Sequence, residues 1–227
     1  MRVWAFVSQK GGSGRSTLCT QLATYACQCG ERVAIVDLDP QGSSLAWHEV
    51  RGKGESPTVI PALPEKLANL VQKIRESGLA TMVMIDTAPH TDKGAVEAIM
   101  AADLVICPQR PGMFDQSSLT STITLLDMAD AKPYAVGVVN AVRGGKAAVS
   151  DYTSVSEKLG DMELRVAAAF IGDKRSIMTA VEEGKGVTEK KGVKDGAGKQ
   201  IIALWDELNM TPAVVINLED HRDEQAI

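Results

Sequence analysis

Residues 9–17 read Gln-Lys-Gly-Gly-Ser-Gly-Arg-Ser-Thr, and this glycine-rich stretch decides the fold. It follows a short apolar run, Val3–Val7, which is typical of a buried strand. Behind it, apolar residues recur at helical spacing before a predicted helix stop at Gly30; they are Leu18, Leu22, Tyr25, Ala26 and Cys29. Small residues let successive backbone N–H groups turn inward around an anion, and the positive end of the following helix faces the same point. The stretch therefore predicts a phosphate-binding loop between a strand and a helix.

Further apolar runs alternate with helical patterns along the rest of the chain. These runs are Val33–Val36, Thr58–Ile60, Met82–Ile85, Ala101–Cys107, Ala135–Val139 and Val166–Phe170. We expect Pro108 to stop one strand, because proline has no N–H to donate, and we expect Val166–Phe170 to be the last strand. Runs buried on both faces that alternate with helices predict an α/β fold. The expected architecture is a single-domain P-loop fold, with a mainly parallel twisted sheet and helices on both faces.

Two of the helices are marked by apolar residues at helical spacing. The first carries Leu63, Leu67, Leu70, Val71 and Ile74, and the second carries Leu119, Ile123 and Leu126 behind Asp115 as its N-cap. Residues 184–200 are rich in Gly and Lys, and we expect mobile surface structure there. We expect a nucleotide-binding domain over residues 1–212 and a flexible acidic tail over residues 213–227.

Polar residues stand at the ends of three predicted strands. Asp37, Asp86 and Asn140 each follow directly on an apolar run. In parallel α/β sheets ligands bind beyond the carboxyl ends of the strands, where the glycine-rich loop also lies. These three residues are therefore expected to gather around the same ligand as the loop.

Composition excludes several other classes of protein. The chain has 227 residues and a formal net charge of −5, which argues against coating nucleic acid with the whole surface but leaves room for a local basic patch. The four cysteines form no C-x-x-C pair, and Cys27 and Cys29 are interpreted as small residues in and beside a helix. With no signal peptide and no apolar run near the roughly 20 residues of a membrane span, we expect a cytoplasmic protein without membrane targeting.

Four segments carry a family resemblance. Residues 10–17, Lys-Gly-Gly-Ser-Gly-Arg-Ser-Thr, resemble the deviant Walker A motif of ParA/MinD-type ATPases, Lys-Gly-Gly-x-Gly-Lys-[Ser/Thr]-Thr. Residues 36–42 resemble the second motif and switch I, residues 85–89 resemble Walker B and switch II, and residues 138–140 resemble the strand end whose Asn reads adenine. The likeness runs from residue 1 to about residue 187 in the family's order and spacing. It is closest to small ParA partition ATPases without an N-terminal helix-turn-helix.

The resemblance implies ATP and Mg²⁺ as ligands. The implied nucleotide-binding residues are Lys10, Gly11, Gly12, Ser13, Gly14, Arg15, Ser16, Thr17 and Asn140, and the implied metal residues are Ser16, Asp37 and Asp86. The implied catalytic residues are Lys10, Arg15 and Asp39, with Asp39 orienting the attacking water. In the family the early lysine reaches across an ATP-bridged dimer, so an ATP-dependent homodimer is implied. The alternative for each aspartate is a turn residue or helix cap, and for Asn140 a turn cap.

Arg15 departs from the family pattern, which has lysine there. Arginine is bulkier than lysine and presents a planar fork instead of a point charge. It still neutralises a phosphate oxygen, but it takes more space over the β- and γ-phosphates. We therefore expect nucleotide binding with slow hydrolysis.

Three branches of the family make different demands on the sequence. The MinD branch binds membranes through a basic C-terminal helix, whereas this C-terminus is acidic, and the iron–sulfur carrier branch needs an absent C-x-x-C. The ParA branch remains: an ATPase that binds nonspecific DNA as a dimer, associates with the nucleoid and segregates cargo with a ParB-like or other adaptor protein.

DNA binding requires a basic surface, and one candidate stretch carries it. The candidate DNA contacts are Lys174, Arg175, Lys185, Lys190 and Lys191. Interspersed acidic residues make a merely solvated lysine-rich face the competing interpretation. The second functional hypothesis is a catalytically weak, nucleotide-dependent switch that binds a protein partner and no DNA. A metabolic ligase or kinase is the third, and it would require a second substrate pocket for which no motif is visible.

Overall fold

The structure is a computed structural model that describes residues 1–52, 54–89, 92–112 and 116–210. Its centre is one six-stranded sheet in the order β3-β2-β4-β1-β5-β6, in which every neighbouring pair is parallel. The strands are β1 (Arg2–Phe6), β2 (Val33–Asp37), β3 (Thr58–Pro61), β4 (Met82–Asp86), β5 (Leu104–Gln109) and β6 (Ala135–Val139). The expected parallel α/β sheet is confirmed.

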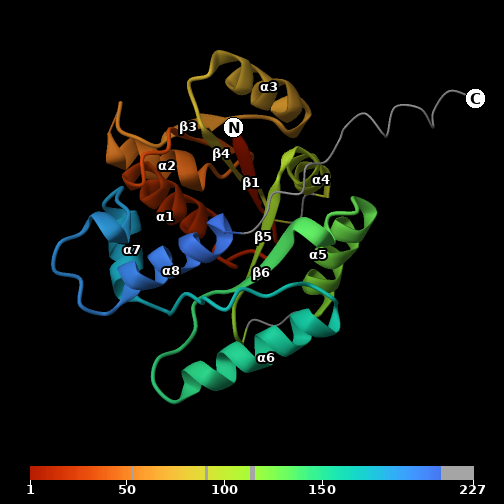
Figure 1. The fold of residues 1–227 in the computed structure, drawn as a ribbon, viewed down its shortest axis with the longest axis vertical. Coiled ribbons are helices and arrows are strands. Elements are labelled where there is room, and N and C mark those ends of the chain that lie inside the picture. Colours follow the sequence, from red (N-terminus) through yellow and green to blue (C-terminus); the bar gives the residue numbers. More distant parts are fainter. Residues whose placement is uncertain (53, 90–91, 113–115, 211–227) are drawn as a thin grey trace, which may run out of the picture.

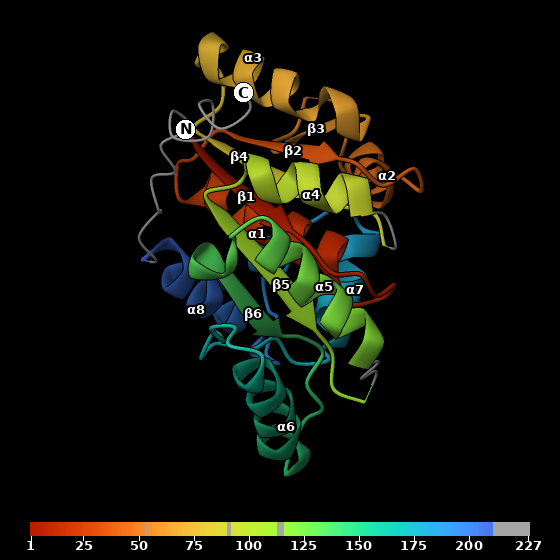
Figure 2. The ribbon, with the colours of Figure 1, turned by 90° about the vertical axis from the view of Figure 1, so that its right-hand side faces the viewer.

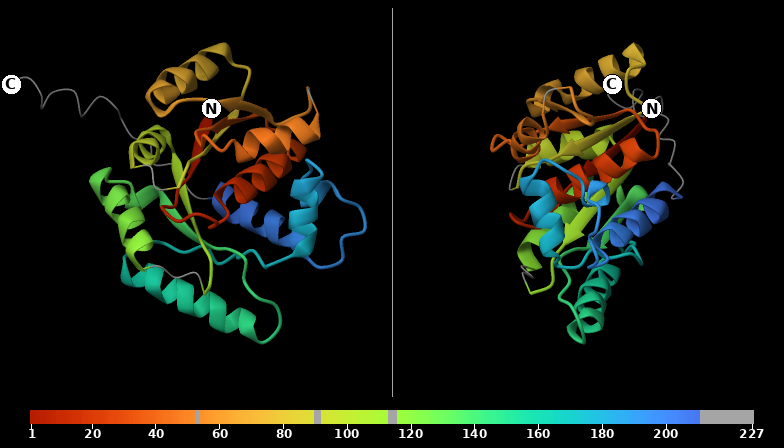
Figure 3. Two further views of the ribbon diagram at one scale, coloured as in Figure 1. Left: turned by 180° about the vertical axis from the view of Figure 1, so that it is seen from behind. Right: turned by 90° about the vertical axis from the view of Figure 1, so that its left-hand side faces the viewer.

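Helices cover both faces of this sheet (Figure 1). One layer consists of α1 (Arg15–Gln28), α2 (Ser43–Arg51), α7 (Arg175–Glu182) and α8 (Ala197–Asn209). The other consists of α3 (Leu67–Ser77), α4 (Asp92–Ala101), α5 (Gln116–Met128) and α6 (Ala147–Asp161). Figure 2 looks onto the side of α4 and α5, and Figure 3 shows the opposite side, with α1, α7 and α8 in front of the sheet. Short 3₁₀ turns are η1 (Pro64–Lys66), η2 (Lys132–Tyr134) and η3 (Val187–Glu189).

Side chains of each strand alternate between the two layers. On β1, Val3 and Ala5 pack toward α4 and α5, whereas Trp4 and Phe6 pack toward α1 and α8. All four are buried. Burial on both faces explains why the strands read as uninterrupted apolar runs without polar alternation.

The carboxyl ends of the central strands meet at one edge of the sheet. In the strand register Asp86 lies beside both Asp37 of β2 and Phe6 of β1. The glycine-rich loop starts from the end of β1, and Asn140 follows the end of β6. The register thus brings Asp37 and Asp86 side by side at this edge, and Asn140 follows another strand that ends at the same edge.

Pro108 does not stop β5, and that expectation was wrong. The strand continues to Gln109, and Pro108 lies opposite Val138 of β6. Val7 donates its N–H to the Ile106 carbonyl at 2.9 Å on the β1 side of β5. Alternation places the Pro108 nitrogen on that same side, where β1 has already ended, so its missing N–H costs no ladder hydrogen bond.

The segment Val166–Phe170 is not a strand, which corrects a second expectation. It lies beside β6 but forms only an isolated bridge with Gly137. The next two backbone N–H groups, of Ala168 and Ala169, donate to the Glu207 carboxylate of α8 at 2.9 and 2.8 Å. Ala167 donates to the Gly137 carbonyl at 2.9 Å, so Ala169 would be the next donor of a continuing ladder, and a side chain from α8 accepts its N–H instead.

The Gly- and Lys-rich residues 184–200, expected to be mobile surface structure, have exposed lysines, but part of the segment packs against the helices. Val187 and Ala197 are buried, and Gly184 lies so close to α2 that an added Cβ would be 2.4 Å from the Arg51 nitrogen. The proposed N-cap Asp115 and the proposed acidic tail, residues 213–227, lie outside the described residues.

Replacing Glu207 by Ala should destabilise the protein by about 1 kcal/mol, because two backbone N–H groups lose a charged acceptor and must turn to water. Urea unfolding measures the change. The neighbouring exposed Asp206→Ala is the matched control and should shift stability by less than about 0.5 kcal/mol. Equal effects of the two substitutions would contradict this role of Glu207.

Candidate functional site

The glycine-rich loop needs its glycines for two physical reasons. Gly12 and Gly14 adopt φ values of 74° and 101°, a left-handed region that residues with a Cβ disfavour. At Gly14 an added Cβ would also lie 2.0 Å from the Asn140 Nδ2 atom. The loop then passes directly into α1, which begins at Arg15, so the first free N–H groups of the helix face the loop.

Arg15 lies under the loop and is held by backbone carbonyl groups. Its Nε donates to the Thr87 carbonyl at 2.9 Å, and its Nη1 donates to the Lys10 carbonyl at 2.7 Å and to the Ser8 carbonyl. The side chain is buried, and burial lowers the pKa of the guanidinium, against which the negative charges of Asp86 and Asp39 act. Arg15 therefore joins the loop to the ends of β1 and β4.

Asp86 is a fully buried carboxylate at the end of β4. The Ser44 hydroxyl of α2 donates to its Oδ2 at 2.7 Å. Its Oδ1 is buried and has no hydrogen-bond partner in the described part of the chain, although the Ser16 hydroxyl is near enough to lower the pKa. Burial dominates and, with the charge of Asp37, raises the pKa of Asp86 to about 7.

Asp37 and Asp39 shape the loop that leads into α2. The Asp37 carboxylate accepts the backbone N–H groups of Asp39 and Leu45, each at 3.0 Å, and the Asp39 carboxylate accepts that of Gln41 at 2.9 Å. Burial raises the pKa of Asp37, and these backbone hydrogen bonds oppose the shift. Asp39 thus forms a turn with Gln41, and Asp37 accepts one N–H from this turn and one from the first turn of α2; these are contacts of the alternative interpretation, a turn residue or helix cap.

Asn140 contacts the loop directly. Its Nδ2 donates to the Ser13 carbonyl at 2.8 Å, and its Oδ1 accepts the Ala141 N–H at 2.9 Å. The side chain therefore fastens the loop to the end of β6. Lys10 contributes its carbonyl to Arg15, and its side chain does not line the adjoining cavity.

A cavity of about 510 Å³ opens beside the loop. Among the predicted site residues it is lined by Gly11, Gly12, Gly14, Arg15, Ser16, Thr17, Asp39 and Asn140. An apolar wall of Trp47, Ile177, Met178 and Val181 closes part of it. The cavity therefore combines a polar loop with an apolar surface, as a nucleotide requires for its phosphates and base.

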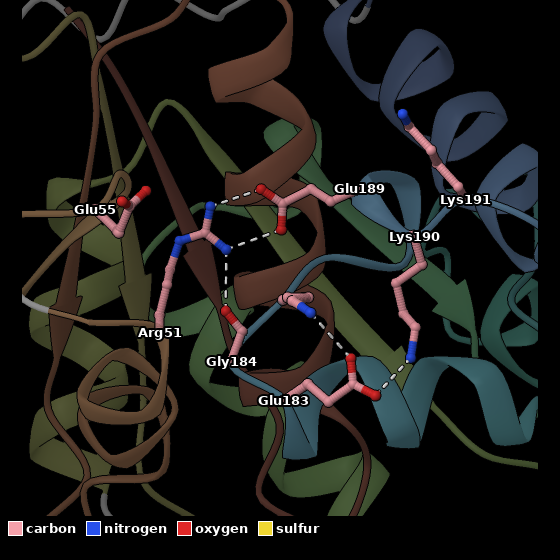
Figure 4. A pocket seen from close by; sticks show the side chains of 8 residues that line it. Arg51, Glu55, Glu183, Gly184, Glu189, Lys190 and Lys191 are labelled. Atoms are coloured by element: carbon pink, nitrogen blue, oxygen red, sulfur yellow. Dashed lines mark hydrogen bonds and ion pairs between the residues drawn. The ribbon is translucent and has the colours of Figure 1, made fainter.

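The candidate DNA contacts do not form one patch. Lys174 lines the cavity and Arg175 begins α7, whereas the other three lysines follow the far end of that helix. There Glu183 pairs with Lys185 at 3.3 Å and with Lys190 at 2.8 Å (Figure 4). Two of the five candidate residues therefore share one carboxylate within the chain, which offsets one of their two positive charges.

The same view shows how residues 184–191, the lysine-bearing segment, are anchored to α2 (Figure 4). Arg51 bonds both carboxylate oxygens of Glu189, at 2.6 and 2.9 Å, and the Gly184 carbonyl at 3.0 Å. The hydrogen bond with Glu189 raises the pKa of Arg51. The segment's position is thus set by the C-terminal end of α2.

The residues present fit a nucleotide with Mg²⁺. The loop offers N–H groups and no side chains at Gly12 and Gly14, where a phosphate needs close approach. The unpartnered Oδ1 of Asp86 and the Ser16 hydroxyl are oxygen ligands of the kind that Mg²⁺ takes directly or through water.

Three residues of the site escaped the sequence analysis: Ser44, Thr87 and Arg110. Ser44 is buried against Asp86, Thr87 accepts from Arg15 through its carbonyl, and Arg110 donates to the Gly12 carbonyl at 3.3 Å. The sequence marks the strand ends near them, but the residue that each one contacts lies 42 to 98 positions away along the chain.

Three features define a P-loop nucleotide-binding protein: an all-parallel sheet, a glycine loop after the first strand, and a buried aspartate at the end of the neighbouring strand in the sheet. A family model described as the CobQ/CobB/MinD/ParA nucleotide binding domain matches residues 4–187. The chain belongs to this family.

Curated relatives are partition and positioning proteins. The chain is 36% identical over 123 residues to maintenance of carboxysome distribution protein A of Gloeobacter kilaueensis, covering 54% of this chain and 55% of that protein. It is 28% identical over 167 residues to chromosome partitioning protein ParA of Caulobacter vibrioides, covering 56% and 62%. The chain thus matches little more than half the length of these relatives.

Solved structures agree with the fold. An ATP complex of Cyanothece McdA has a TM-score of 0.71 at 17% identity, with 94% of this chain and 98% of that chain covered. The MinC:MinD complex of Aquifex aeolicus has a TM-score of 0.73 at 19% identity, with 93% and 97% covered. MinD of Pyrococcus horikoshii with Mg-ADP has a TM-score of 0.68 at 18% identity, with 92% and 96% covered. Within the described residues, no helix has the length and apolar character of a membrane span.

Without nucleotide and metal, the stability difference between wild type and Asp86→Asn should depend on pH. The folded pKa of Asp86, about 7, lies above its ordinary value of 3.8, so the folded state holds this proton more tightly. The stabilisation from that proton is present below pH 3.8 and is lost as the pH rises to about 7. Wild type should therefore lose stability relative to Asp86→Asn across this window, by a few kcal/mol at most. Parallel urea titrations at several pH values would refute this if the two proteins kept a constant difference.

Proposed function

We propose that the chain is an ATP-dependent positioning ATPase of the partition type. It binds Mg-ATP, forms an ATP sandwich dimer, binds nonspecific DNA and segregates a plasmid, chromosome or other cargo with a ParB-like or other adaptor protein. The observation that carries the proposal is the junction of the glycine loop, Arg15 and the buried Asp86 at one edge of the sheet. The names of the relatives support it, since they describe carboxysome distribution and chromosome partitioning.

Each predicted residue has an assigned role in this proposal. Backbone groups of residues 11–17 surround the phosphates, and Asn140, which lines the same cavity, contacts the base. Ser16 holds Mg²⁺ directly, Asp86 holds it through water, and Asp37 supports them by ordering the adjacent loop. When bound, Mg²⁺ neutralises charge on the phosphates. Asp39 orients the attacking water.

Hydrolysis is slow in this proposal because of Arg15. Its guanidinium is bulky and is held by three carbonyl groups, so it does not follow the phosphates as a flexible lysine would. Slow hydrolysis then keeps ATP bound and the dimer assembled for longer, so that the rate of hydrolysis sets when the dimer is released.

The runner-up is a nucleotide-dependent switch that binds a protein partner and no DNA. The ion pairs of Glu183 favour it, because they reduce the free positive charge of the lysine-bearing segment. A gel shift with nonspecific duplex, with and without ATP, separates the two functions. Retardation that requires ATP supports partition, and its absence in a protein that still binds ATP supports the switch.

ATP should bind in the presence of Mg²⁺, with preference over GTP, as measured by calorimetry. Asp39→Ala should reduce hydrolysis at least about 100-fold while ATP affinity stays within about threefold, because the residue acts on water and not on the nucleotide. Asp39→Asn keeps an oxygen acceptor for the Gln41 N–H and should behave in the same way. Binding of neither nucleotide, or a preference for GTP, would show that the proposed function is wrong.

Lys10→Ala should prevent the ATP-dependent dimer, because the long side chain at the mouth of the loop is proposed to reach the partner's γ-phosphate. Light scattering with ATP and with ADP measures assembly, and retention on duplex DNA at rising salt measures its consequence. The control Lys158→Ala removes an exposed lysine from α6 and should dimerise like wild type. If Lys10→Ala dimerises and retains DNA equally well, Lys10 is not the ATP sensor.

A further inference from the structure

The donors of Arg15 are largely committed to the protein itself. A guanidinium has five N–H groups, and the one on Nε and the two on Nη1 face carbonyl oxygens of Thr87, Ser8 and Lys10. Only Nη2 has no hydrogen-bond partner among the described residues. Arg15 therefore acts chiefly as a brace under the loop, and most of the charge-assisted hydrogen bonding to a polyphosphate must come from elsewhere.

Arg110 is a second arginine that lines the cavity. It follows directly on β5 and its Nη1 reaches back to the Gly12 carbonyl at 3.3 Å. Gly12 has no side chain, and both residues line the cavity. The guanidinium thus lies at the rim of the loop with a single long hydrogen bond to it, and its other donors have room to face a ligand.

The backbone under Arg110 is fixed to the loop by a chain of hydrogen bonds. The preceding residue, Gln109, accepts the Asn140 N–H at 2.7 Å, and the Asn140 amide donates to Ser13 at 2.8 Å. The base of the Arg110 side chain and the loop therefore belong to one frame. Such a frame holds a binding group near a ligand before the ligand arrives.

Lys174, the remaining cation that lines the cavity, is placed differently. Its Cε lies 2.9 Å from where a Cβ on Gly172 would stand, so its stem packs over that glycine and not over the loop. Of these two described cations at the cavity, Arg110 and Lys174, it is the partly exposed Arg110 that contacts the loop backbone.

We propose that Arg110 binds the terminal phosphates of the nucleotide and that Arg15 is a positioning residue that braces the loop. This inference rests on the proposed function, since it assigns the phosphate-binding cation of that same site. The ligand class is a nucleoside di- or triphosphate, and AMP, which lacks the terminal phosphates, is the comparison ligand.

The test is calorimetry of Mg-ATP, Mg-ADP and AMP with wild type, Arg110→Gln and Arg110→Lys. Arg110→Gln should weaken Mg-ATP binding by about tenfold or more, leave AMP binding unchanged and flatten the salt dependence of ATP affinity. Arg110→Lys keeps the charge and should recover part of the loss. Arg75→Gln removes an exposed arginine from α3, away from the cavity, and should bind all three nucleotides like wild type.

The outcomes separate this inference from the function on which it rests. If wild type binds ATP and Arg110→Gln binds it equally well with the same salt dependence, Arg110 is not a phosphate residue and the proposed function stands. If Arg110→Gln loses AMP and ATP binding alike, its hydrogen bond to Gly12 merely supports the loop and the inference is wrong. If wild type binds no nucleotide, both are wrong.

Discussion

The buried guanidinium of Arg15 is the interaction on which the site depends. A cation out of water must be compensated, and here the compensation comes from backbone carbonyls of Ser8, Lys10 and Thr87, with Asp86 and Asp39 near enough to act through their charge. These groups belong to the end of β1, the glycine loop and the end of β4. One side chain bonds all three segments, so the planar guanidinium of Arg15 sets how the loop and the two strand ends lie relative to one another.

A second constraint links this site to the opposite end of α2. At the start of that helix, Ser44 bonds Asp86 and the Leu45 N–H bonds Asp37. At its end, Arg51 donates two hydrogen bonds to the Glu189 carboxylate of the lysine-bearing segment. A nine-residue helix pinned at both ends behaves as one body. Its two ends therefore cannot shift independently, which ties the segment with Lys185 and its neighbours to the carboxylates beside the loop.

Family membership accounts for the architecture, whereas the particular function depends on local charges. Structures at less than 20% sequence identity share the sheet and the covering helices. Burial of the strands constrains the volume and the spacing of apolar side chains more than it constrains which apolar residue stands at each position. The surface is less constrained. Glu183 pairs with two of the lysines proposed to contact DNA and offsets one of their charges, and Arg15 stands where the family's motif has lysine. Our proposals on hydrolysis and on DNA binding rest on these local charges and not on the fold.

Sequence by itself determined the parallel sheet, the position of the loop and the gathering of Asp37, Asp86 and Asn140, because apolar runs and glycine spacing act over a few residues and strand ends converge by geometry. Only the tertiary structure decided which partners those side chains take. Pro108 is tolerated because β1 has ended beside it, and residues 166–170 form no regular strand because Glu207 accepts the N–H of Ala169, the next donor of the ladder. Likewise Arg110 reaches Gly12 from 98 positions away. No local pattern encodes such contacts, since each depends on where distant segments of the chain are brought together by packing.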